Sequence, residues 1–101
     1  MNDARAEPAR FDVTGDPPRW IVRGALTFEH AAEALEAAQG IELPASGRVD
    51  LSQAGPVDSS ALALIFALQR RARAEQRALA FDGLPEELTS LARVYGVENL
   101  L

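Results

Sequence analysis

The sequence contains no cysteine and no lysine, and its single histidine is His30. Without cysteine there is no disulfide, no thiolate metal site and no thiol nucleophile. Without lysine there is neither a Schiff-base amine nor the lysine of a phosphate-binding loop. One histidine cannot form a histidine cluster around a metal, and Gly55 stands alone rather than in a glycine-rich loop. We therefore expect no cofactor, no metal site and no catalytic residues.

Long apolar runs and an excess of positive charge are also missing. No stretch approaches the roughly 20 apolar residues that span a bilayer, and the first residues lack the apolar segment of a secretory signal. All ten basic residues are arginine, against 15 acidic residues, which gives a net charge of −5. Binding to nucleic acid needs a basic surface, so we do not expect a nucleic-acid partner. The composition of the 101 residues predicts one cytoplasmic domain.

The order of predicted elements indicates the fold class. Residues 1–10 are small, polar and proline-bearing and predict a disordered leader, and residues 11–101 form the domain. Alternating apolar patterns predict strands at 11–14, 19–23, 48–52, 78–81 and, at the end, 97–101. Apolar stripes predict helices at 27–39, 59–74 and 84–95, with a loop containing Gly55 and Pro56 between the third strand and the second helix. This order predicts an α/β single domain with a mostly parallel sheet, an N-terminal β-hairpin and three helices packed on it.

The most informative stretch is Asp58-Ser59-Ser60, which opens the strongly apolar second helix. One interpretation is structural, because Asp or Ser at a helix start accepts hydrogen bonds from free N–H groups and stabilises by about 1 kcal/mol. The other is functional, because a helix N-terminus also tolerates a phosphoserine or a partner contact. The two are compatible, since one side chain can cap while its neighbour points outward.

Other candidate sites are weaker. A Ser-His-Asp set would need His30 beside Ser59 or Ser60, but His30 lies on the first predicted helix, where we interpret it as a solvated residue. Glu86 and Glu87 are adjacent on a helix, do not face each other and complement the helix dipole. The arginines at 70, 71, 73 and 77 fit either a solvated helix face or a site for anionic lipid head groups.

The sequence Val49-Asp50-Leu51-Ser52, followed by Val57-Asp58-Ser59-Ser60-Ala61-Leu62-Ala63-Leu64, resembles the STAS domain of anti-sigma factor antagonists and sulfate transporters. Gly24-Ala25-Leu26-Thr27-Phe28 is similar to an early turn of that family, with Ala25 in place of its acid. The resemblance runs from about residue 19 to residue 101. It implies a STAS fold and a non-enzymatic interaction role. It also implies a partner-binding surface formed by Asp58, Ser59, Ser60, Thr27 and Phe28.

Two branches of this family differ in what they imply. In anti-sigma factor antagonists the hydroxyl matching Ser59 is the phosphoacceptor of an anti-sigma kinase, but here Ala61 and Ala63 replace two glycines typical of that branch. The Leu62-Ala63-Leu64 run, the arginine-rich helix end and residues 91–97 are more similar to the MlaB branch. Its members are cytoplasmic subunits that bind the ATPase of Mla-type phospholipid ABC transporters.

The MlaB resemblance implies an ABC transporter ATPase subunit as partner. The membrane is then reached only indirectly, through the complex, at the cytoplasmic face of the inner membrane. The alternative is an anti-sigma factor antagonist that is switched by phosphorylation at Ser59. Because some members of the wider family bind nucleotides or lipids, the resemblance also leaves a small ligand open.

Overall fold

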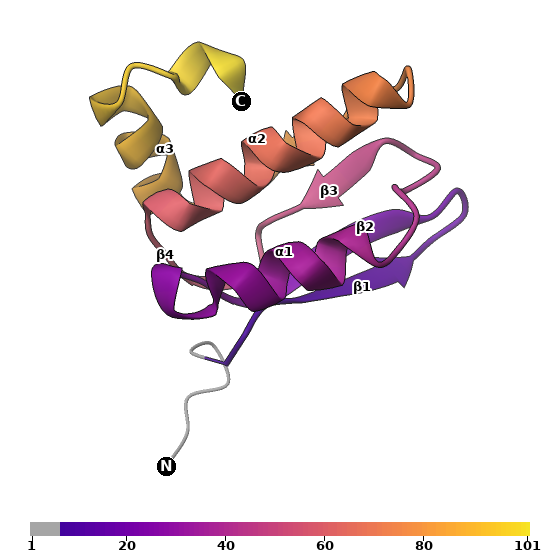
Figure 1. Ribbon diagram of the computed structural model, residues 1–101, viewed down its shortest axis with the longest axis horizontal. Helices are drawn as coiled ribbons and strands as arrows, with labels where there is room; N and C mark the ends of the chain where they lie inside the picture. Colours follow the sequence, from indigo (N-terminus) through magenta and orange to yellow (C-terminus); the bar gives the residue numbers. More distant parts are fainter. Residues whose placement is uncertain (1–6) are drawn as a thin grey trace.

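A five-stranded sheet carries helices α1 and α2 side by side on one face (Figure 1). The structure is a computed structural model, and it describes residues 7–101. The strands are β1 (Arg10–Thr14), β2 (Arg19–Leu26), β3 (Arg48–Asp50), β4 (Ala54–Val57) and β5 (Ala80–Asp82). The helices are α1 (Ala31–Gln39), α2 (Ser59–Ala74) and α3 (Glu86–Val94). Two short 3₁₀ helices, η2 (Phe28–His30) and η3 (Glu98–Leu100), precede α1 and follow α3.

The sheet is mixed and mostly parallel. Its order is β1-β2-β3-β5, and β4 pairs with the far end of β2. β1 and β2 form an antiparallel hairpin, whereas β2–β3, β2–β4 and β3–β5 are parallel pairs. The predicted α/β class, the N-terminal β-hairpin and the three packed helices are therefore confirmed. In the part of the chain that the structure describes, no helix has the length and apolarity needed to cross a bilayer.

The strand register separates the sheet into an apolar face and a charged face. One row across the strands joins Val13, Trp20, Val49 and Phe81. The next row, on the opposite face because side chains alternate along a strand, joins Asp12, Ile21, Asp50 and Asp82. Two ion pairs lie on this second face: Arg23 Nε–Asp12 Oδ2 at 2.9 Å and Arg48 Nε–Asp82 Oδ2 at 3.0 Å. Ion pairs this exposed add little stability, so this face is best understood as solvated.

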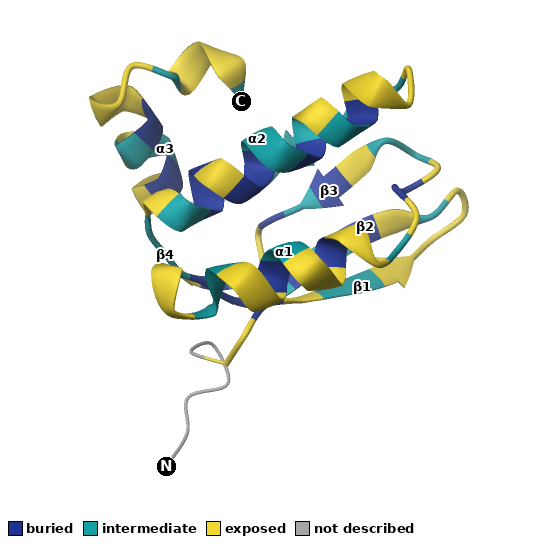
Figure 2. Cartoon of the chain, in the orientation of Figure 1, coloured by how far each residue is buried: buried dark blue, intermediate teal, exposed yellow. Residues whose placement is uncertain are grey.

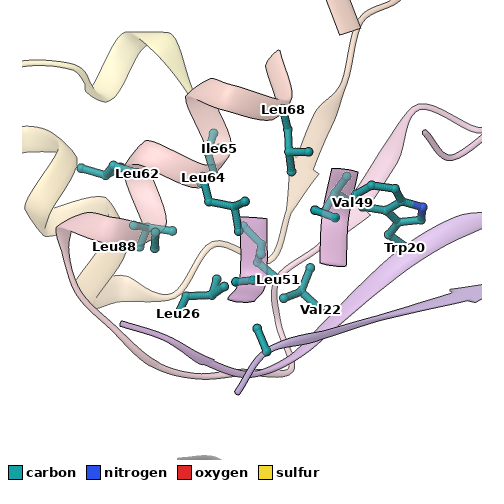
Figure 3. Packing of buried hydrophobic residues seen from close by; sticks show 14 of the residues in the cluster. Trp20, Val22, Leu26, Val49, Leu51, Leu62, Leu64, Ile65, Leu68 and Leu88 are labelled. Carbon is teal, nitrogen blue, oxygen red and sulfur yellow. The ribbon is translucent and has the colours of Figure 1, made fainter. Parts of the chain in front are cut away.

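The core lies between the apolar face of the sheet and α2. Figure 3 shows side chains from β2, β3, α2 and α3 converging there: Trp20, Val22, Leu26, Val49, Leu62, Leu64, Ile65, Leu68 and Leu88. α2 also contacts α1 on one side and α3 on the other. Burial on several sides explains why the first half of this helix is apolar nearly all round. Only a narrow outer stripe of α2, which includes Ser59 and Ala63, stays exposed (Figure 2).

Residues 54–57, predicted as part of a loop, form strand β4. Gly55 and Pro56 predict a loop, but β4 pairs with one strand of the described chain, β2, where Gly24 faces Ala54 and Leu26 faces Val57. Proline is tolerated in a strand whose N–H side has no partner strand, and Gly55 is buried. β4 therefore continues the line of β3 after a short interruption and carries the chain to the start of α2.

Residues 97–101 were predicted as a strand, and this prediction is wrong. They contain η3 instead, and the Leu100 carbonyl accepts a hydrogen bond from Gln69 Nε2 of α2 at 2.9 Å. The segment thus lies beside α2 rather than at the sheet (Figure 1). Local apolar alternation over five residues cannot distinguish these two positions.

The predicted leader, residues 1–10, falls partly outside the described residues, which begin at Glu7. Within the described part, Pro8 forms a bridge with Ala25, Ala9 is 8% exposed, and Arg10 begins β1. The Glu7 carbonyl also accepts a hydrogen bond from the Ala25 N–H at 2.7 Å. The chain is thus packed against β2 before residue 11, where the predicted domain began.

Candidate partner-binding site at the start of helix α2

Asp58 is the residue that organises the start of α2. Its Oδ1 accepts a hydrogen bond from the Ser60 N–H at 2.8 Å, which caps the helix. Its Oδ2 accepts a second one from the Phe28 N–H at 2.9 Å. One carboxylate therefore joins the first turn of α2 to the turn between β2 and η2, which are 30 residues apart in the sequence. Asp58, Ser60 and Phe28, three of the predicted site residues, are brought together by these bonds.

The electrostatics of Asp58 follow from these bonds. Burial raises the pKa of its carboxyl, but the bonds from the Phe28 and Ser60 N–H groups, together with the Ser60 side chain, outweigh burial and lower that pKa overall. Asp58 is therefore a carboxylate at neutral pH. The position suits a negative charge, because the N-terminal end of a helix carries positive potential.

Asp50 and Ser52, from the first half of the same motif, have a structural role. Asp50 Oδ1 accepts a hydrogen bond from the Ser52 N–H at 2.8 Å, where the chain leaves β3. The bonds from Ser52 lower the pKa of Asp50 against the opposing effect of burial, and the charges of Arg19 and Arg23 lower it further. A side chain that bonds the backbone two residues on forms a turn, so this half of the motif bends the chain toward β4.

Ser59 differs from its neighbours because it is exposed and its hydroxyl forms no hydrogen bond within residues 7–101. Asp58 already provides the cap, so Ser59 is not needed for it. Ser60 is half-buried under the cap. Both interpretations of the Asp-Ser-Ser sequence are therefore compatible with the geometry: Asp58 caps, while Ser59 presents a free hydroxyl at the surface.

Thr27, one of the predicted site residues, lies at the turn between β2 and η2. Thr27 occupies the cap position in extended conformation, but its side chain makes no capping bond, and its carbonyl accepts a hydrogen bond from the His30 N–H at 3.0 Å. The predicted helix over 27–39 begins as η2 and becomes α1 only at Ala31. The side-chain acceptor at this turn is Asp58, which no local pattern could indicate.

Exposed apolar side chains lie on the elements that meet the start of α2. Phe28 is 83% exposed, and Val94 and Tyr95 at the end of α3 are 80% and 58% exposed. Val94 and Tyr95 lie in the segment 91–97 that is similar to the MlaB branch, but neither was predicted as a site residue. The spacing of Val94 from Leu88 in the sequence could have indicated that Val94 is exposed. It lies six residues after the buried Leu88, which places it on the far side of a helix with 3.6 residues per turn.

Two shallow hollows lie at the start of α2, one lined by Asp58 and the other by Ser59. One, of about 570 Å³, is lined by residues of β4, α2 and α3: Val57, Asp58, Glu86, Glu87, Ser90, Leu91 and Val94. The other, of about 380 Å³, lies between α2 and the segment after α3 and is lined by Ser59, Leu62, Ala63, Phe66, Tyr95 and Val97. We call the surface formed by Phe28, Ser59, Val94, Tyr95 and these hollows the α2 N-terminal surface. It is apolar at its centre and acidic at its α3 edge.

The geometry does not assemble the catalytic arrangements considered above. Both oxygens of Asp58 accept bonds from backbone N–H groups, so this carboxylate does not orient an imidazole. Within the described range, no hydrogen bond links His30 to Ser59 or Ser60, and His30 Nδ1 has no partner. His30 is half-buried rather than fully solvated as predicted. No group of three or more His, Cys, Asp or Glu among residues 7–101 could hold a metal ion.

Comparison with known proteins places this fold and motif in a family. A family model described as Mlab, STAS domain, matches residues 9–101. The chain belongs to this family. It is therefore a STAS-domain protein of the MlaB type, and the resemblance seen in the Val-Asp-Leu-Ser and Asp-Ser-Ser sequences is confirmed. A search of curated proteins found no match. STAS domains are in general interaction domains rather than catalysts, which directs attention to the α2 N-terminal surface.

Proposed function

We propose that this chain is a non-enzymatic STAS subunit that binds and supports the ATPase of a phospholipid-transporting, Mla-type ABC complex. The contact is made by the α2 N-terminal surface, with Asp58, Ser59, Ser60, Thr27 and Phe28 at its centre. The observation that carries the proposal is Phe28: its aromatic side chain is 83% exposed, and its N–H is bonded to Asp58, the residue before the exposed Ser59. The match to a family of the MlaB type supports the choice of partner.

The arrangement of this surface supports a protein as the occupant. Buried aromatic anchors dominate the energy of protein interfaces, and exposed Phe28, Val94 and Tyr95 are suited to that role. The hollows beside Ser59 can receive side chains of a partner. The acidic edge, from Glu86 and Glu87, favours a partner surface that is apolar at its centre and basic on one side.

Binding to the purified ATPase subunit of the same organism tests the proposal, measured by titration calorimetry and co-purification. We expect Phe28→Ala to weaken binding by about tenfold or more, because loss of an aromatic anchor costs about 2 kcal/mol or more and each step of about 1.4 kcal/mol is a factor of ten. Ser59→Arg should abolish binding, since it puts a large cation into the centre of the contact.

Each variant has a matched control on the same fold. Val13→Ala removes an apolar side chain that is 56% exposed on β1, away from the proposed contact. Ala74→Arg adds the same charge as Ser59→Arg at the exposed other end of α2, about 22 Å away by helix rise. Both controls should bind like the wild type. If Ser59→Arg and Phe28→Ala also bind like the wild type, the proposed interface is wrong.

The free Ser59 hydroxyl favours a second candidate function, an anti-sigma factor antagonist switched by phosphorylation at that residue. Phosphate adds a charge of about −1.5 to −2 to a surface that already carries Asp58, Glu86 and Glu87. At the apolar centre of the contact, this charge would lose its hydration on binding, and that cost would release a partner. Intact-mass measurement after incubation with ATP and the cognate kinase is the test, with Ser59→Ala as the control. If the protein gains no phosphate at Ser59 or Ser60, this candidate is ruled out.

A further inference from the structure

A second concave site lies near the other end of α2. It is a cleft of about 360 Å³ between α2, the chain entering β5 and the C-terminal segment. Its charged side chains are Arg70, Arg73 and Arg77, and none of the acidic residues within 7–101 lines it. Arg73 is 14 residues beyond Ser59, or about 21 Å along the helix, so the cleft is separate from the α2 N-terminal surface.

The arginines of this cleft are not used by the fold in the same way. The Arg77 guanidinium is fixed by hydrogen bonds to the Leu43 and Pro44 carbonyls. Arg71, which does not line the cleft, bonds Glu75, Ala38 and Ile41. Arg70 and Arg73 are exposed and form no ion pair within residues 7–101. In a protein of net charge −5, three clustered guanidiniums with no carboxylate of the described residues lining the same cleft form a distinct positive site.

The cleft also has an apolar side. Half-buried Phe66 and Leu79 line it, and Leu100 stays 54% exposed at its rim. The Leu100 carbonyl bonds Gln69 Nε2 at 2.9 Å, which holds the C-terminal segment against α2. A merely solvated helix face would not need an exposed leucine beside its arginines. The combination fits an occupant that carries both negative charge and an apolar side chain.

We infer that this cleft binds a short acidic segment of a partner protein, with carboxylates on Arg70 and Arg73 and an apolar side chain against Phe66 and Leu100. Arg70 and Arg73 are three residues apart and neighbour each other on one helix face, so they can receive two carboxylates of one segment. Carboxylate–guanidinium bonds are among the stronger hydrogen bonds. The site does not depend on the proposed partner of the α2 N-terminal surface.

Charge and shape favour a protein segment over an anionic membrane. A bilayer presents an extended negative plane, which the net charge of −5 would repel over about one Debye length. A short segment meets only the local positive charge of the cleft. The volume is at the small end of ligand pockets and the site is concave, which suits a few side chains rather than a flat surface.

The test is an NMR titration of the full chain with a blocked tetrapeptide in which two glutamates lie between two leucines. We expect saturable shifts at the amides of Gln69, Leu79 and Leu100 and no such shifts with a peptide carrying glutamines instead. Arg70→Gln with Arg73→Gln should weaken binding by about tenfold. Arg10→Gln with Arg19→Gln, which lowers the net charge equally on the open sheet face, should leave binding unchanged.

Three results would overturn the inference. The first is peptide-induced shifts of equal size in both double variants. The second is the same shifts produced by inorganic phosphate alone. The third is binding to phosphatidylglycerol vesicles without binding to the peptide. Both double variants replace exposed arginines, and their own spectra show whether the fold is retained. Ser59→Arg should leave peptide binding intact, so failure at this cleft and failure of the proposed ATPase contact can be told apart.

Discussion

The double role of Asp58 gives a quantitative prediction. Its carboxylate caps α2 through Ser60 and also bonds the Phe28 N–H. The cap contributes about 1 kcal/mol, and the second hydrogen bond contributes about 1 kcal/mol more. Asp58→Ala should therefore lower the free energy of unfolding by about 2 kcal/mol, which for a domain of this size lowers Tm by roughly 8–16 °C. Asp58→Ser should cost only about half as much, because serine still caps but cannot serve both N–H groups.

Chemical unfolding followed by circular dichroism measures these free energies, and amide hydrogen exchange separates the two bonds. In Asp58→Ser the Phe28 amide should exchange faster while the Ser60 amide stays protected. Glu36→Ala is the control: it removes the same charge from an exposed position of α1 and should change stability by less than about 0.5 kcal/mol. Unchanged Phe28 exchange in Asp58→Ser, or equal stability of Asp58→Ala and wild type, would refute the bridge between the two turns.

Three further predictions follow from the same structure. Because the folded-state pKa of Asp58 is lowered, its stabilisation is present above the unfolded pKa of about 3.9 and is lost as pH falls through the folded value. The stability gap between wild type and Asp58→Asn should therefore narrow below about pH 4 in unfolding titrations, and a constant gap would contradict this. Gly24→Ala should destabilise far more than Gly96→Ala in thermal unfolding. Both glycines have positive φ, but a Cβ at Gly24 would lie 2.6 Å from the Pro8 carbonyl oxygen, while Gly96 has open space; equal losses would show that this contact can relax. Leu88 is fully buried, so Leu88→Ala should lower the free energy of unfolding, measured by urea denaturation, by about 2–5 kcal/mol. Leu100 is 54% exposed, so Leu100→Ala should lower it by less than about 1 kcal/mol. Similar losses for the two variants would place Leu100 in the core.

Much of the fold could be predicted because its elements carry strong local patterns. α2 was predicted with its observed bounds, Ser59 to Ala74, since a polar cap precedes a long apolar run. β4 and η3 were not predicted. For β4 the reason is that Gly55 and Pro56 form a strand only when β2 supplies a partner. The final segment is held by Gln69, 31 residues from Leu100. Such contacts are set by the tertiary structure and leave no periodic signal.

The candidate site was predicted in part for the same reason. Asp58, Ser59 and Ser60 are contiguous, so their sequence identifies a helix start. Phe28 was selected from a resemblance, and the structure adds its link to Asp58, a bond across 30 residues. Val94 and Tyr95 lie at the end of α3, and only the folded chain brings them to the hollows at the start of α2. Val94 and Tyr95 are recognised as candidate contact residues by their exposure in the folded chain and not by their residue types.

The division of roles between Asp58 and Ser59 sets what a modification of Ser59 can do. A phosphate at a helix start is usually stabilised by free N–H groups, but Asp58 already occupies the Ser60 N–H. A phosphate on Ser59 would meet that carboxylate and, across the adjacent hollow, Glu86 and Glu87. Since Ser59 is exposed and holds no bond of the fold, we expect its charge to act on a partner rather than on stability. Ser59→Glu should therefore keep Tm within about 2–3 °C of wild type while it reduces partner binding, and a large loss of Tm would show that Ser59 is structural after all.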